Sequence, residues 1–219
     1  MKLSLIGFEL CPYAQRVAIV MNECGIEYER IYIDLANKPN WFLDKSPLGK
    51  VPILETSEGV LFESNVICEY VNDMSRAHLH PENDFQRARN KSWIEYGSSI
   101  LSLISQLYNS KDKQPFNKVL TEIRKRMQFL ENEVHGQFLN GDKFMIVDAV
   151  YATVFRYFNV IETRNNLDLL GQSSKIEDWR NNIFKRVSVK NAVVKDFDEK
   201  LLEFYLNRES YISSILKEI

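Results

Sequence analysis

The residue best suited to covalent chemistry is Cys11, which stands directly before a predicted helix that begins at Pro12. Proline has no backbone N–H and a fixed φ, so it fits the first position of a helix. We therefore expect the Cys11 sulfur at a helix N-terminus, where unpaired N–H groups and the helix dipole stabilise an anion. This position predicts a lowered thiol pKa and a reactive thiolate.

The other two cysteines, Cys24 and Cys68, fall on the apolar faces of predicted helices and are interpreted as small buried hydrophobic residues. Position 14 is alanine, so a Cys-x-x-Cys pair is absent and redox chemistry at Cys11 needs an external thiol. Three cysteines, all in the first third of the chain, do not form the pattern of a secreted disulfide scaffold. We expect a reducing, cytoplasmic location.

Two further segments could bind a small peptide beside this thiol. Pro52 opens a predicted strand, and a cis bond before it would turn the backbone N–H and C=O of Val51 outward, where they could pair with an extended peptide. Ser64 is predicted to cap another helix, whose N–H groups would hold a carboxylate, and Glu63 could accept an ammonium group. Together with Cys11, these residues describe a pocket for a small zwitterionic thiol peptide.

The elements that must position these residues alternate in type up to residue 75. The pattern predicts strands and helices in the order β-α-β-α-β-β-α, over residues 2–7, 12–24, 28–33, 39–45, 51–54, 60–62 and 64–71. The helix between the first two strands makes them parallel, and the short turn before residue 60 makes the last two an antiparallel hairpin.

Beyond this region every periodic segment is helical, with predicted helices over residues 93–107, 119–134, 146–158, 176–187 and 192–206. The fold class is thus a mixed α/β domain over 1–75, a linker over 76–84 and an all-helical domain over 85–219. Aromatic residues of the helical domain are mostly core by spacing, with one or two left as candidates for a second-substrate pocket. These are Trp93, Tyr96, Tyr108, Tyr151, Phe155, Tyr157 and Trp179.

Composition removes several classes of partner. The 219 residues are 45% hydrophobic and carry a formal net charge of −2, which gives no electrostatic case for nucleic acid or an anionic membrane as the main partner. The longest apolar run, residues 17–21, is far shorter than the roughly 20 residues that span a bilayer. His78 and His80 lack a cysteine or carboxylate cluster at ligand spacing and are interpreted as exposed linker histidines, so no metal is expected.

The run Cys11–Arg16, the segment 46–54 and the pair Glu63–Ser64 resemble the glutathione S-transferase family, which joins a thioredoxin-like N-terminal domain to a helical C-terminal domain. The segment Asn37–Phe42 further resembles the omega class, whose catalytic residue is a cysteine. The resemblance implies a glutathione-dependent thiol transferase in which Cys11 forms a mixed disulfide with glutathione. Dehydroascorbate reduction is a related activity, and the second substrate would be a small electrophile or disulfide.

The same resemblance assigns the glutathione-binding residues. Tyr13 would stand at the aromatic position beside the sulfur, and Lys38 would reach the glycyl carboxylate. Val51, before the expected cis-Pro52, would pair with the cysteinyl backbone. The γ-glutamyl end would be bound by Glu63 and Ser64.

A different class of function stays open, namely a non-catalytic binding or regulatory protein on the same scaffold that interacts with other proteins. The retention of Cys11 and of the binding residues argues against it, because a pure scaffold has no physical need for a thiol-peptide site. The family resemblance also implies a homodimer. One departure from the family pattern is Met145 in place of a hydroxyl cap before Asp148, and we expect Asp148 still to satisfy the local N–H groups.

Overall fold

The computed structural model describes residues 3–165, 167–171 and 173–217. The chain divides into two compact units. The first runs to Leu79 and includes Arg186–Lys195, and the second comprises His80–Lys185 with the chain from Asp196 onward.

The first unit is built on a four-stranded sheet in the order β2-β1-β3-β4. Its strands are β1 (Ser4–Gly7), β2 (Glu29–Tyr32), β3 (Ile53–Glu55) and β4 (Val60–Phe62). Strands β1 and β2 are parallel, and β3 and β4 are antiparallel, which confirms both predicted pairings. Strand β1 also pairs with β3, antiparallel.

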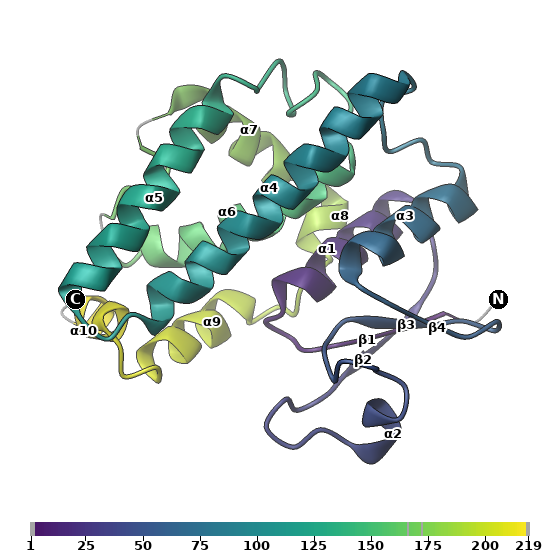
Figure 1. Ribbon diagram of the computed structural model, residues 1–219, viewed down its shortest axis with the longest axis horizontal. Coiled ribbons are helices and arrows are strands. Elements are labelled where there is room, and N and C mark those ends of the chain that lie inside the picture. The colour runs from purple at the N-terminus through teal and green to yellow at the C-terminus, as the bar shows by residue number, and fades with distance from the viewer. Residues whose placement is uncertain (1–2, 166, 172, 218–219) are drawn as a thin grey trace. The chain divides into compact units, whose positions relative to one another are not determined.

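Helices cover both faces of this sheet. They are α1 (Pro12–Glu23), α2 (Asn40–Leu43) and α3 (Ser64–Ser75), so the predicted order β-α-β-α-β-β-α is confirmed. Figure 1 shows α1 and α3 side by side on one face and α2 on the other, where its Phe42 packs with Ile6 and Ile53 of the sheet. Gly7 lets α1 come close, because a Cβ at this position would lie only 2.9 Å from the Cβ of Ala14.

A segment remote in sequence completes the first unit. Helix α8 (Val187–Lys190) packs on α1, and Arg186 donates to both carboxylate oxygens of Glu23, from Nε and Nη2, each at 2.6 Å. The Asn22 side chain donates to the Ser188 carbonyl at 2.9 Å. The predicted helix over 192–206 was wrong at its start, because these first residues pack on the first unit and the next helix begins only at Phe197.

The second unit is helical throughout its regular elements, apart from an isolated bridge between Phe138 and Gly141. Its helices are α4 (Asp84–Asn109), α5 (Lys113–Glu131), α6 (Ile146–Glu162), α7 (Ser174–Lys185), α9 (Phe197–Leu206) and α10 (Tyr211–Lys217). Helix α6 is buried almost all round, as its sequence predicts. It lies against α4 at Gly97, where a Cβ would come within 2.7 Å of the Val150 side chain.

The start of α6 is organised by Asp148, whose carboxylate is fully buried. It accepts hydrogen bonds from the Met145 N–H at 2.7 Å, the Leu139 N–H at 3.1 Å and the Trp179 Nε1–H at 2.8 Å. The expectation that Asp148 satisfies the local N–H groups without a hydroxyl cap is confirmed. Within the described residues, no helix is both long enough and apolar enough to cross a bilayer.

Candidate active site

Cys11 occupies the position before α1, as the sequence predicts, with extended backbone dihedrals of φ −71° and ψ 116°. Its side chain is largely buried, at 8% exposure. The sulfur lies 3.9 Å from the carbonyl oxygen of Val51, and the Val51–Pro52 peptide bond is cis. The loop before β3 therefore brings its backbone against the thiol.

The electrostatics of Cys11 differ from the sequence prediction. Burial raises the pKa of the Cys11 thiol, because the thiolate loses its hydration. The backbone N–H groups of Ala14 and Tyr13 and the positive charge of Arg16 act in the opposite direction without reversing the shift. The prediction of a lowered pKa was wrong, since it took account of the helix N-terminus but not of the burial.

A cavity of about 480 Å³ lies in the first unit, and all six residues predicted to bind glutathione line it. They are Tyr13, Lys38, Val51, Pro52, Glu63 and Ser64. Cys11 does not itself line the cavity, but its thiol contacts the carbonyl of Val51, and Val51 is a lining residue. The structure thus brings together residues that four separate segments of the chain supply.

One wall of the cavity is the loop that leads into β3. The Ser46 hydroxyl accepts from the Lys50 N–H at 3.0 Å and donates to the Lys50 carbonyl at 2.9 Å, which closes the loop on itself. Lys38 Nζ donates to the Gly49 carbonyl at 2.9 Å, so its ammonium group is held at the edge of the cavity. Gly49 has a φ of 57°, which favours glycine at this turn.

Another part of the cavity lining is the start of α3. Glu63 precedes the helix with φ 66° and ψ 111°, a conformation that is costly for a residue with a side chain. Ser64 is buried and is the first residue of the helix rather than its cap, so the predicted capping role was wrong by one position. A strained residue at a cavity wall is typical of a functional site.

Arg16 belongs to the run Cys11–Arg16, but the sequence pattern predicts no separate role for it. Its side chain is 1% exposed, and its Cζ lies 4.9 Å from the centre of the Tyr13 ring. Its Nη1 donates to Oδ1 of Asn65 at 2.6 Å, immediately after Ser64. A positive charge among the apolar positions of α1 was the signal that could have drawn attention to it.

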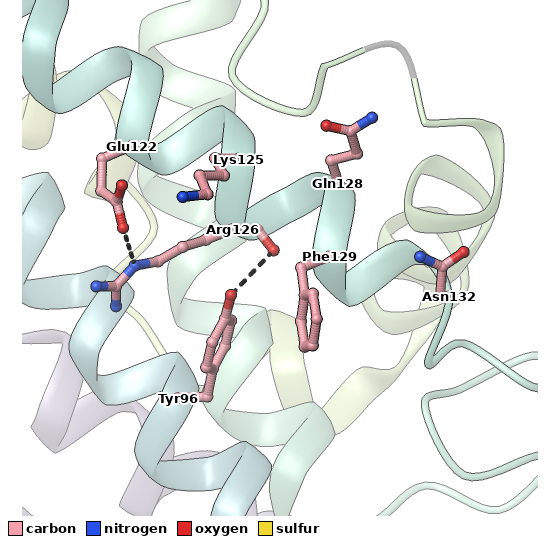
Figure 2. A pocket seen from close by; sticks show the side chains of 7 residues that line it. All are labelled: Tyr96, Glu122, Lys125, Arg126, Gln128, Phe129 and Asn132. Atoms are coloured by element: carbon pink, nitrogen blue, oxygen red, sulfur yellow. Dashed lines mark hydrogen bonds and ion pairs between the residues drawn. The ribbon is translucent and has the colours of Figure 1, made fainter.

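The second unit has a larger cavity, of about 690 Å³, between α4 and α5. Figure 2 shows Tyr96 and Phe129 side by side in it, with the Tyr96 hydroxyl donating to the Arg126 carbonyl at 3.4 Å. Arg126 Nε donates to Glu122 at 2.9 Å, so that charge is compensated. Of the aromatic candidates for a second-substrate pocket, Tyr96 therefore borders a cavity, whereas three are fully buried: Tyr151, Phe155 and Trp179.

Of the two histidines predicted to be exposed, His78 is exposed, but the prediction was wrong for His80. His80 is buried, not exposed, and its Nδ1 lies 2.8 Å from Nδ2 of Asn90. Asn90 in turn accepts from Asn140 at 2.6 Å, so this imidazole belongs to a polar network inside the second unit. In the described parts of the chain, no group of three or more histidine, cysteine or acidic side chains is arranged to hold a metal ion.

Comparison with known proteins agrees with this geometry. The family models for the glutathione S-transferase N-terminal and C-terminal domains match residues 10–74 and 88–186. The chain is 33% identical over 182 residues to glutathione S-transferase omega-1 of Mus musculus, covering 81% of this chain and 75% of the relative. It is 27% identical to "Glutathione S-transferase DHAR3, chloroplastic" of Arabidopsis thaliana, covering 83% of this chain and 68% of the relative.

Among solved structures, glutathione transferase Omega 3C of Trametes versicolor superposes with a TM-score of 0.80 at 26% identity. The match covers 88% of this chain and 89% of the other. The domain matches, the omega relatives and the shared architecture lead to one conclusion. The chain belongs to the glutathione S-transferase family and is similar to its omega class.

Proposed function

We propose that this glutathione-dependent transferase is a thiol transferase that acts through a mixed disulfide between Cys11 and glutathione. The observation that carries the proposal is the contact of the Cys11 thiol with the Val51 carbonyl, at the edge of a cavity lined by all six predicted binding residues. A thiol in this position can reach the sulfur of a peptide whose backbone lies along Val51.

Charge and hydrogen-bonding capacity in the cavity match the functional groups of glutathione. The Lys38 ammonium group suits the glycyl carboxylate, and the backbone of Val51 suits the cysteinyl amide. At the other wall, the first N–H groups of α3 and the Ser64 hydroxyl suit the γ-glutamyl carboxylate, while Glu63 suits its ammonium group. The ligand would thus lie across the cavity with its sulfur towards Cys11.

The reaction begins with deprotonation of Cys11. The thiolate attacks the glutathione sulfur of a mixed disulfide R-S-SG, the S–S bond breaks, and RS⁻ leaves and takes up a proton. The thiolate of a second glutathione then attacks the glutathione sulfur of Cys11-S-SG. Glutathione disulfide leaves, and Cys11 returns as a thiolate. Dehydroascorbate reduction at the same cysteine is a related activity, and conjugation of glutathione to electrophiles would be weak.

The test is intact-mass spectrometry after incubation with glutathione disulfide and again after addition of excess glutathione. We expect the wild type to gain one glutathionyl group that glutathione removes, and Cys11→Ser to gain none. Cys24→Ser is the matched control, because Cys24 is the other thiol with some exposure, and it should behave like the wild type. An adduct of equal yield in Cys11→Ser would refute the mechanism.

One observation favours a second candidate function. Burial raises the pKa of the Cys11 thiol, which weakens it as a nucleophile at neutral pH. A non-catalytic member of the family that binds glutathione or a protein partner would tolerate such a thiol. Binding of glutathione measured by calorimetry, together with no detectable adduct or thiol-transfer turnover, would favour this candidate.

We also propose a homodimer in a reducing compartment such as the cytoplasm. Family membership supports the dimer, as do the exposed apolar side chains Phe62 and Val66 in the first unit and Phe85 and Phe129 in the second. Three free cysteines suit a reducing compartment. Light scattering should give about twice the chain mass of 25.7 kDa, and a mass of one chain would contradict the dimer.

A further inference from the structure

Arg16 is a charged side chain in the core of the first unit. At 1% exposure it is among the largest fully buried side chains of the protein. Guanidinium groups stay protonated in proteins, and burying one carries a large desolvation penalty. Methionine or leucine would fill a similar volume without this cost, so the charge must interact with something that benefits from it.

Arg16 is connected to the candidate active site in three ways: through helix α1, through Tyr13 and through Asn65. It lies on α1, one turn beyond Pro12, so it shares the helix that begins behind Cys11. Its guanidinium is within cation–π distance of Tyr13, which lines the cavity, and it donates to Asn65 at the start of α3. Asn65 directly follows Ser64, which also lines the cavity.

We propose that Arg16 is a positioning residue for thiol transfer, which holds the starts of α1 and α3 at the separation that one glutathione molecule requires. The inference rests on the proposed function, because it concerns the same cavity. The positive charge has a second effect, since it lowers the pKa of the Cys11 thiol against the larger effect of burial. The Arg16 side chain thus affects both the separation of α1 and α3 at the cavity and the pKa of the Cys11 thiol.

A purely structural role would produce a different pattern among variants. Arg16→Met keeps the volume and removes the charge, Arg16→Lys keeps a charge and loses the planar fork, and Asn65→Ala removes the acceptor on α3. The matched control is Arg30→Met. Arg30 is a half-buried arginine of the same unit that bonds to Tyr28 and to the Ala192 carbonyl and does not line the cavity.

The experiment measures two quantities on folded protein, checked by circular dichroism. The first is the pH profile of Cys11 alkylation by iodoacetamide without glutathione, with Cys24→Ser as the background. The second is the split between KM for glutathione and kcat in thiol transfer. We expect Arg16→Met to move the alkylation midpoint upward by about one pH unit. Arg16→Lys should move it less, and Asn65→Ala should mainly raise KM, about tenfold.

The outcomes separate the two proposals. If the wild type forms a glutathione adduct but Arg16→Met and Arg16→Lys keep the wild-type alkylation profile and KM, the role of Arg16 is overturned and the thiol-transfer mechanism stands. If Arg30→Met shifts both quantities as far as the Arg16 variants do, the effect is one of general stability and the inference also fails. If the wild type forms no adduct, both proposals fail. Should Arg16→Met not fold, Arg16→Lys and Asn65→Ala decide.

Discussion

Each unit of this protein contains a charged side chain with at most 1% exposure, Arg16 in the first and Asp148 in the second, and the surroundings of the two differ. Asp148 in the second unit accepts three N–H donors that belong to the local chain and to a core tryptophan. Arg16 in the first unit contacts Tyr13 and Asn65, next to the candidate active site. A buried charge that organises a helix start should affect stability when removed, whereas one beside the proposed nucleophile Cys11 should affect chemistry as well.

The largest expected effect is on the Asp148 side of this comparison. We expect Asp148→Ala to lower the free energy of unfolding by about 3–5 kcal/mol, because three N–H donors lose a charged acceptor. Urea denaturation measures the change. Asp142→Ala is the control, since Asp142 is exposed and accepts a single long bond from the Gln137 N–H, at 3.4 Å. If the folded Asp148→Ala protein forms less glutathione adduct than the wild type, the claim that Asp148 affects stability alone is contradicted.

The next effect concerns pH. Burial raises the pKa of the Cys11 thiol, so the thiolate fraction should rise about tenfold per pH unit below the folded pKa and should still be rising at the ordinary thiol pKa, and alkylation should rise with it. The unfolded chain releases this proton at lower pH. The corresponding stability is therefore present below the ordinary pKa and is lost as pH rises through the folded value.

Cys68 provides the internal control for this pH dependence. It is fully buried, and burial raises its pKa to about 12. Peptide mapping of the alkylated protein should show modification of Cys11 between pH 8 and 10 and none of Cys68 while the protein stays folded. Equal labelling of the two cysteines would show that alkylation reports unfolding rather than the environment of Cys11.

Two glycines sharpen the comparison further. A Cβ at Gly97 would meet Val150 at 2.7 Å, and one at Gly7 would meet Ala14 at 2.9 Å. We expect each alanine variant to lose about 1 kcal/mol of unfolding free energy through overpacking. Gly7→Ala should also slow the alkylation of Cys11, because it pushes on the first turn of α1. Gly97→Ala should leave the alkylation rate of Cys11 unchanged. An equal fall of that rate in Gly97→Ala would contradict the assignment of the site to the first unit alone.

The smallest expected effect comes from backbone strain. Glu63 has a φ of 66°, and Glu209 in the second unit has a φ of 50°. Replacement by glycine relieves strain at either position. It should raise the free energy of unfolding by about 0.5–1 kcal/mol, which would appear as a higher melting temperature. Glu63→Gly should also weaken glutathione binding in calorimetry, whereas Glu209→Gly should not. Unchanged binding in Glu63→Gly would remove Glu63 from the proposed site.

The sequence predicted the first unit well because its elements are short and separated by clear turn residues. The segment from Cys11 to Arg16 and the pair Glu63–Ser64 carry enough local pattern to place the cavity walls. What failed depended on contacts between distant residues. The burial that raises the pKa of Cys11, the packing of 186–195 on the first unit and the burial of His80 all arise from tertiary structure that no local pattern encodes.

The segment that carries α8 has a consequence for synthesis of the chain. The first unit includes Arg186–Lys195, whose Arg186 bonds to both carboxylate oxygens of Glu23 at the end of α1. A ribosome must translate most of the second unit before it reaches this segment. Until then, the side of α1 on which α8 packs is uncovered in the nascent chain. A fragment that ends at Leu79 would keep the cavity residues but lack the segment that packs on α1.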